Sequence, residues 1–271
     1  MLISREGIGN ESNEIKLKST GSCINCSLKN ANFSEANFSG FTNLAGADLS
    51  GANFSGADLS GGADFIGADL SGVDFSGANF IKLGGLPPIL FSKANLSGAD
   101  FSGIYLAGAN FSGADLSGVT LNNPNFKIGK YSAQLKNVSA MIWFSNFSGA
   151  DLSGGDFSGA DFSGHADFSR ADLSGANFSG AKFTGGIFKL DFSGAILSKT
   201  NFSGADFSGA NLSKLDFSDT NLSKTNLSKA NLSKTNLTGV DLSEANLKGI
   251  ILNGAILCET KTPWGIDNSG C

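Results

Sequence analysis

The sequence contains few of the residues that enzymes and metal sites commonly use. Its 271 residues include a single histidine, His165, and charged residues make up only 16% of the chain, against roughly 25% in an average protein. One histidine leaves little room for histidine-based catalysis or a histidine metal site. No apolar run approaches the roughly 18 residues of a membrane span, and the polar N-terminus shows no apolar core of a signal peptide. A net charge of −5 also argues against direct binding of nucleic acid through a basic patch.

Glycine, phenylalanine and one short repeat are abundant instead. The chain has 37 glycines and 23 phenylalanines, and quintets such as ANFSG, ADLSG and ADFSG recur from Ala31 to about Leu257. The small and the large residue of each quintet lie two positions apart, so both face one side of an extended segment and the Asp or Asn between them faces the other. Ser-Gly then closes a tight turn. A helix is excluded, because a five-residue period would spread the large residues around it.

The spacing of the large residues predicts four sides to each coil. Most of these central positions follow one another at the quintet period, but a step with one extra residue ends at 44, 65, 86 and 168. The intervals from 44 to 65, from 65 to 86 and from 147 to 168 all equal four quintets plus one residue. One extra residue per four quintets puts the insertions at one corner of successive coils. We therefore expect a square coil with stacked bulges along one edge.

The phenylalanines follow the same register. Twenty-one of the 23 occupy quintet centres, and the other two, Phe41 and Phe144, occupy the inserted corner. This stripe predicts a core of stacked rings rather than a cofactor site. Each buried Phe or Leu stabilises the fold by about 1.5–3 kcal/mol.

The chain divides into three segments. Residues 1–20 carry no repeat and are expected to form a flexible arm or a loose N-terminal cap. Residues 21–257 carry the repeat, which is irregular at 81–92 and at 127–146, and 258–271 are expected to cap the open edge of the last coil. Lysine replaces the turn glycine at several late corners: Lys214, Lys224, Lys229 and Lys234. That replacement predicts a type I-like turn there.

The motif A-(D/N)-(L/F)-S-G resembles the pentapeptide-repeat family over most of the chain. The resemblance implies an all-β fold, a right-handed quadrilateral parallel β-helix of about eleven coils stacked roughly 4.8 Å apart, with terminal caps. Such a rod implies a non-enzymatic structural scaffold or protein-interaction module whose partner protein is unidentified. Some family members protect DNA gyrase by mimicking duplex DNA, which gives the alternative function.

The four cysteines lie in two pairs near the two ends of the repeat. A shared zinc site is excluded, because about 50 Å would separate Cys23 and Cys26 from Cys258 and Cys271, whereas zinc needs its sulfurs within about 2.3 Å. The two ends look like the caps of a family subgroup with members in the thylakoid lumen or periplasm, which suggests cap disulfides. Buried thiols are the alternative for Cys23 and Cys26. Disulfides would require an oxidising compartment, whereas the missing signal peptide favours the cytoplasm.

The acidic residues bear on the DNA-mimic alternative, because mimicry needs a continuous acidic stripe. With coils of four quintets, some of them with one extra residue, one face is expected to stack Asp48, Asp69, Leu90, Asn110, Lys130, Asp151 and Asp172. Apolar and basic residues interrupt this column, which argues against mimicry. In the last coils, the offset of four quintets predicts ion pairs between Lys199 and Asp219 and between Lys224 and Glu244.

The inserted corner is the candidate partner-binding site. It carries Phe41, Leu83, Phe144 and His165. If its apolar members project outward, they form a strip along one edge that a partner protein could cover. The alternative is that each bulge folds inward or shields its corner. We expect no catalytic residue, no metal and no cofactor, and the coil ends offer a route to a homo-oligomer.

Overall fold

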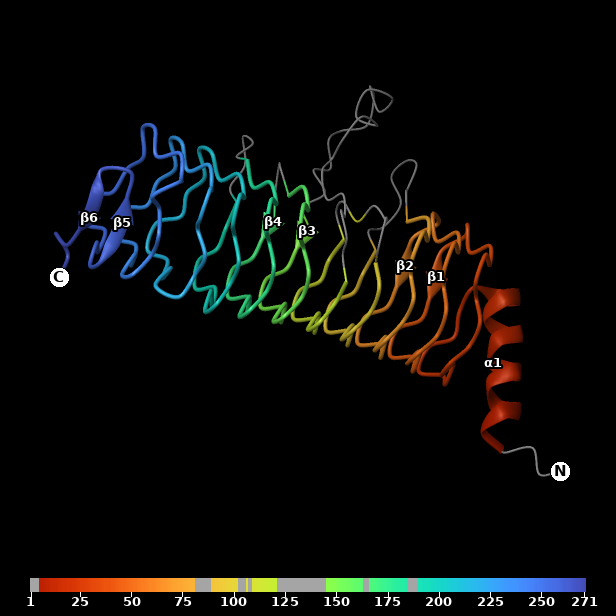
Figure 1. The fold of residues 1–271 in the computed structure, drawn as a ribbon. Helices are drawn as coiled ribbons and strands as arrows, with labels where there is room; N and C mark the ends of the chain where they lie inside the picture. The colour runs from red at the N-terminus through yellow and green to blue at the C-terminus, as the bar shows by residue number, and fades with distance from the viewer. Residues whose placement is uncertain are drawn as a thin grey trace, which may run out of the picture.

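A computed structural model describes residues 5–80, 89–101, 106, 109–120, 145–162, 166–184 and 190–271. Stacked coils form a rod, with helix α1 (Arg5–Thr20) against one end and strands β5 (Thr260–Thr262) and β6 (Gly265–Asp267) at the other (Figure 1). The other strands are two residues long: β1 (Thr42–Asn43), β2 (Ala63–Asp64), β3 (Ser145–Asn146) and β4 (Ala166–Asp167).

Four backbone ladders run along the rod. In the first two coils, parallel bridges join positions that lie one coil apart: 22 with 43, 27 with 48, 32 with 53, and 37 with 58. Four bridges in each coil describe a four-sided coil, as the spacing predicted. We number the faces by these bridges, so that face 1 contains Asn43, face 2 Asp48, face 3 Asn53 and face 4 Asp58.

Each quintet places its small and its large residue in the bore of the rod. Ala63 and Phe65 are fully buried, and Asp64 between them is partly exposed. The rings stack from coil to coil: the centroid of Phe91 lies 5.2 Å from that of Phe65 and 5.0 Å from that of Phe111, with interplanar angles of 5° and 8°. Because each buried ring or leucine stabilises the fold by about 1.5–3 kcal/mol, the filled bore is the main source of stability.

The corners are turns whose third residue has a positive φ. The backbone N–H of Ala47 donates to the carbonyl of Leu44 at 3.1 Å around Gly46, whose φ is 67°, and this is the type II pattern. The type I-like turns predicted for the lysine corners are therefore wrong. The φ angles there are 68° at Lys214, 58° at Lys224, 58° at Lys229 and 61° at Lys234. The prediction failed because the ladder bonds of the neighbouring coils, and not the residue at the corner, determine the turn.

The Asp or Asn of each quintet stabilises the turn that follows it. Oδ1 of Asp48 accepts hydrogen bonds from the backbone N–H and the hydroxyl of Ser50, at 3.1 and 2.7 Å. On face 3, each asparagine amide donates a hydrogen bond to Oδ1 of the residue in the preceding coil. Asn177 donates to Asp156, Asn201 to Asn177 and Asn221 to Asn201, at distances of 3.0 to 3.1 Å. The polar residues therefore hold the flat faces in register.

Three of the coils contain more than four quintets and one extra residue. On face 1 the bridged positions are 43, 64, 90, 110, 146, 167 and 191, so the coils 64–90, 110–146 and 167–191 are longer than their neighbours. Phe91, rather than Leu86, therefore occupies the centre above Phe65, and the predicted placement of Leu86 one coil after Phe65 is wrong. The spacing alone could not separate an inserted segment of quintet length from one more quintet. Leu86 itself lies outside the described residues.

The N-terminal segment also differs from the sequence expectation. In place of the flexible arm or loose cap expected over 1–20, Arg5–Thr20 form α1. Leu17 of α1 is fully buried, and the side-chain amide of Asn13 donates to the carbonyl of Ser27 at 2.9 Å. The polar sequence of this segment shows no amphipathic period, so docking onto the first coil stabilises the helix more than its own propensity does.

Candidate functional site

The predicted apolar strip falls largely outside the described residues. Phe41 lies at the corner just before β1 and is 45% exposed. Leu83, Phe144 and His165 are not among the described residues. The strip therefore stays a prediction, supported at one position.

The cysteines lie beside the two caps. The structure joins Cys23 to Cys26 and Cys258 to Cys271, with Cα atoms 5.6 and 4.8 Å apart. Cys23 is fully buried next to α1. At the other end, the backbone N–H of Gly270 donates to the carbonyl of Leu257 at 3.1 Å, so the chain end lies against the last coil. The second pair therefore fastens the C-terminal cap to the last coil, whereas both cysteines of the first pair lie in the first coil itself.

We expect all four cysteines of the unreduced, urea-unfolded protein to resist alkylation by iodoacetamide. Labelling before reduction would contradict the disulfides. Replacing Cys258 with serine opens the loop that the second disulfide closes and is expected to lower the free energy of unfolding by about 3 kcal/mol. Urea unfolding, with and without a reductant, measures this loss, and reductant should abolish the difference between the two proteins.

The acidic residues form a more continuous column than the sequence predicted. Face 2 stacks Asp48, Asp69, Asn95, Asp115, Asp151 and Asp172. The predicted column was wrong, because the long coil 64–90 moves Leu90 and Asn110 to face 1, and the long coil 110–146 then returns Asp151 to face 2. Lys130 lies outside the described residues. Face 2 is therefore a line of carboxylates with one amide in it, Asn95, whose Nδ2 donates to Oδ1 of Asp69 at 3.2 Å.

Ion pairs are few in the described part of the chain. Lys224 lies 3.7 Å from Glu244, which confirms that predicted pair, and both side chains are mostly exposed. The other predicted pair, Lys199 with Asp219, is not among the ion pairs of the described residues. Exposed pairs of this kind contribute little to stability.

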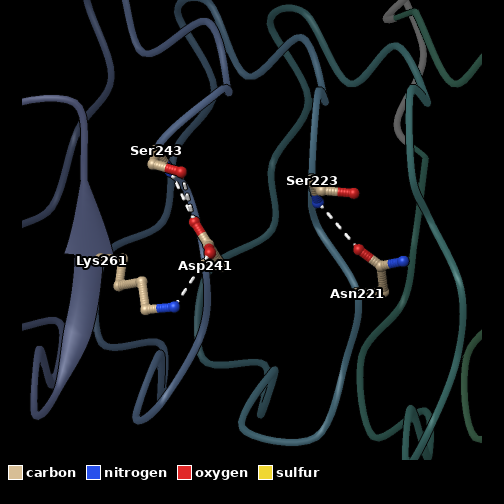
Figure 2. A network of polar contacts seen from close by, with 5 residues as sticks. All are labelled: Asn221, Ser223, Asp241, Ser243 and Lys261. Atoms are coloured by element: carbon tan, nitrogen blue, oxygen red, sulfur yellow. Dashed lines mark hydrogen bonds and ion pairs between the residues drawn. The ribbon is translucent and has the colours of Figure 1, made fainter.

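The last coils carry a polar network around Asp241 (Figure 2). The hydroxyl and the backbone N–H of Ser243 donate to Oδ1 of Asp241 at 2.6 and 3.0 Å, and Nζ of Lys261 lies 3.4 Å from Oδ2. These contacts, with the Ser243 hydroxyl first, lower the pKa of Asp241 below its ordinary value. The same backbone bond joins Ser223 to Asn221 at 3.0 Å in the preceding coil.

Replacing Ser243 with alanine is expected to raise the pKa of Asp241 more than replacing Lys261 with glutamine does, because the hydroxyl bond has the largest effect. A lowered pKa in the folded state means that the carboxylate stabilises the fold at neutral pH and loses this effect as the pH falls through its pKa. Carboxyl NMR titration of the two variants measures both pKa values. The reverse order would contradict the assignment.

No group of three or more His, Cys, Asp or Glu side chains is placed to hold a metal ion within the described ranges. None of the helices described is long and apolar enough to cross a membrane.

Comparison with known proteins bears on the family. One family model described as pentapeptide repeats matches residues 22–62, 90–123, 190–223 and 220–257. A second model of the same description matches 44–82 and 147–190. None of the curated proteins matches the chain.

Several solved structures are similar to this chain. HetL, a pentapeptide repeat protein involved in heterocyst differentiation regulation from the cyanobacterium Nostoc sp. strain PCC 7120, is 26% identical, covers 94% of this chain and 97% of its own, and has a TM-score of 0.40. QnrB1, a plasmid-mediated fluoroquinolone resistance protein, is 20% identical over 86% of this chain and 89% of its own, with a TM-score of 0.41. A pentapeptide repeat protein of the Arabidopsis thaliana thylakoid lumen is 30% identical over 54% of this chain and 70% of its own, with a TM-score of 0.21.

The two family models together match well over half of the chain, and the ladders describe a four-sided coil. The chain therefore belongs to the pentapeptide-repeat family, whose members form right-handed quadrilateral β-helices.

Proposed function

We propose that this protein is a non-enzymatic rod of about eleven coils that binds another protein along its outer surface. The observation that carries the proposal is the filled bore. Side chains such as Phe91 and Phe147 are fully buried and stacked through Phe111, so the outward-facing polar residues and the corners are the parts that meet other molecules. Four flat faces with regular side chains suit a scaffold or a docking surface.

The corner between faces 4 and 1 is the first surface to test. We expect the immobilised rod to capture a partner from native cells, identified by mass spectrometry, and the variant with Phe41, Leu83 and Phe144 all changed to serine to lose it. Ile24 is 50% exposed at a different corner, so Ile24→Ser is the control that retains the partner. Unchanged capture by the triple variant would rule out the strip as the binding surface.

A DNA-mimicking, gyrase-binding function is the second candidate, and the column on face 2 favours it. That column places five carboxylates on one face, with coils roughly 4.8 Å apart. A gyrase supercoiling assay with the purified protein tests it. No inhibition at micromolar concentration would exclude mimicry.

If the protein inhibits gyrase, two triple variants can show whether the inhibition depends on the position of the carboxylates or only on the net charge. Changing Asp69, Asp115 and Asp151 on face 2 to asparagine should abolish the inhibition. The control changes three carboxylates of face 1 to asparagine: Asp64, Asp167 and Asp191. Equal losses in the two triple variants would show a general charge effect and contradict mimicry by face 2.

A further inference from the structure

Four lysines border face 1 in the last coils. Lys214 and Lys234 lie on the corner between faces 1 and 2 in neighbouring coils, where the backbone N–H of Lys214 donates to the carbonyl of Ser233 at 3.0 Å. Lys229 and Lys248 lie on the opposite corner of the same face, and the backbone N–H of Lys229 donates to the carbonyl of Lys248 at 2.9 Å. All four side chains are exposed, and none takes part in the ion pairs of the described residues.

The face between these lysines carries no carboxylate in its last three coils. Its outward residues are Asn211, Asn231 and Ile251, and Nδ2 of Asn231 donates to Oδ1 of Asn211 at 3.2 Å. Along this face the nearest carboxylate is that of Asp191, one coil earlier. A chain with a net charge of −5 thus has a local surface with four positive charges around neutral amides.

The backbone at these corners indicates that the fold does not require the lysines. Lys214, Lys229 and Lys234 have φ angles of 68°, 58° and 61°, in the left-handed region that strains a residue with a Cβ atom. Glycine occupies the equivalent turn position in most earlier coils, for example Gly46 and Gly98. Lysine therefore replaces the residue that the turn favours, and its charge is what the replacement adds.

We infer that this basic face binds an extended, carboxylate-rich segment of a partner protein. Carboxylates complement the four lysines, and the amides of Asn211 and Asn231 offer hydrogen bonds to a peptide backbone. Three coils span about 10–15 Å, the length of about four extended residues. The inference rests on the proposed protein-binding function and gives the chemistry of one partner.

Two other occupants fit the surroundings less well. A nucleic-acid duplex would extend over the carboxylates of Asp206 and Asp216 on the neighbouring faces, and of Asp191 on face 1. An anionic membrane favours a basic surface next to an exposed aromatic residue. Trp264 is 62% exposed, but it lies in the turn between β5 and β6, beside face 3 rather than face 1.

Fluorescein-labelled hexaglutamate is the probe. Fluorescence anisotropy should show saturable binding at about 0.01 M salt that is lost at about 1 M salt, where the screening length falls from roughly 30 to 3 Å. The double variant Lys229→Gly/Lys234→Gly should bind roughly tenfold more weakly. Its thermal midpoint should be unchanged or higher, because glycine suits a positive φ. A role in fold stability alone would predict a lower midpoint instead.

The matched control is Lys93→Gly/Lys199→Gly. It removes the same charge from exposed lysines with φ angles of 60° and 57°, at positions away from the basic face. This control should bind hexaglutamate within about twofold of the wild type.

Three outcomes would overturn the inference. They are equal weakening of binding in both double variants, a lower thermal midpoint for Lys229→Gly/Lys234→Gly, and stronger binding of phosphatidylserine vesicles or a DNA oligonucleotide than of hexaglutamate. If hexaglutamate does not bind while the rod still captures a cellular partner, the inference fails and the proposed function stands.

Discussion

Replacing Phe178 with alanine is expected to lower the free energy of unfolding by about 3–5 kcal/mol. The Phe178 side chain is fully buried, and its ring centroid lies 4.7 Å from that of Phe157 and 5.5 Å from that of Phe202, with both pairs stacked. Removing the ring therefore leaves a cavity that opens two neighbouring coils at once. Urea unfolding followed by circular dichroism measures the loss.

Two controls separate the lost ring from a general effect of substitution. Phe178→Leu should cost about 1.5 kcal/mol or less, because leucine already fills equivalent centres such as Leu173. Phe41→Ala removes an exposed ring and should change stability by at most about 0.5 kcal/mol. If the two alanine variants were equally destabilised, the stacked bore would not be the main source of stability.

Replacing Gly61 with alanine is expected to destabilise the protein by about 1–3 kcal/mol. Gly61 lies at the inserted corner, where a Cβ atom would overlap the carbonyl oxygens of Ser39 and Gly40 in the preceding coil. Those oxygens belong to the backbone, so two coils must move apart to admit the methyl group. Thermal unfolding measures the change.

Gly40 provides the matched control, since it lies one coil earlier at the same corner. A Cβ atom at Gly40 meets no atom within 4 Å, and its φ is not in the left-handed region. Gly40→Ala should be neutral or stabilising by up to about 1 kcal/mol, because alanine restricts the unfolded chain. Destabilisation of similar size at both positions would contradict the close stacking of this corner.

The square coil and its core were predictable because they depend on local pattern. A residue such as Phe54 is buried whatever coil it stacks on, since its position in the quintet points it into the bore. The register between distant coils was not predictable in the same way. Leu90 pairs with Asp64 across one of the three long coils, and the length of the intervening segment alone does not show how much of it lies outside the coil.

For the candidate surfaces too, the local pattern was predictable from the sequence and the stacking of distant coils was not. The Asp and Asn positions were clear in the sequence, but the acidic column of face 2 became visible only when the structure placed Asp115 beside Asp151. The basic face had a signal in the sequence, because Lys214 and Lys234 are separated by four quintets, the length of one coil. The sequence interpretation missed it by treating Lys214, Lys229 and Lys234 only as replacements of the turn glycine. The left-handed φ of these lysines could come only from the structure.

The sequence pattern did not predict helix α1 at the N-terminus. Its sequence carries no repeat, and Ile15 of the helix is 68% exposed while Leu17 is fully buried. One buried leucine and the contact from Asn13 to Ser27 hold the helix on the first coil. Such docking depends on the surface of the finished coil, which the helical segment alone does not describe.

Cross-linking across the long coil 110–146 tests the stacked square coil most directly. Asp115 and Asp151 are bridged neighbours on face 2, so cysteines in both positions should form a disulfide in the folded protein, detected by peptide mapping. A uniform coil of four quintets would instead place Asp115 beside Leu135. The structure predicts that Asp115→Cys/Asp151→Cys cross-links and that Asp115→Cys/Asp156→Cys, with its second cysteine on face 3, does not. The opposite result would contradict the stacking of the coils across 110–146 and the acidic column of face 2 that depends on it.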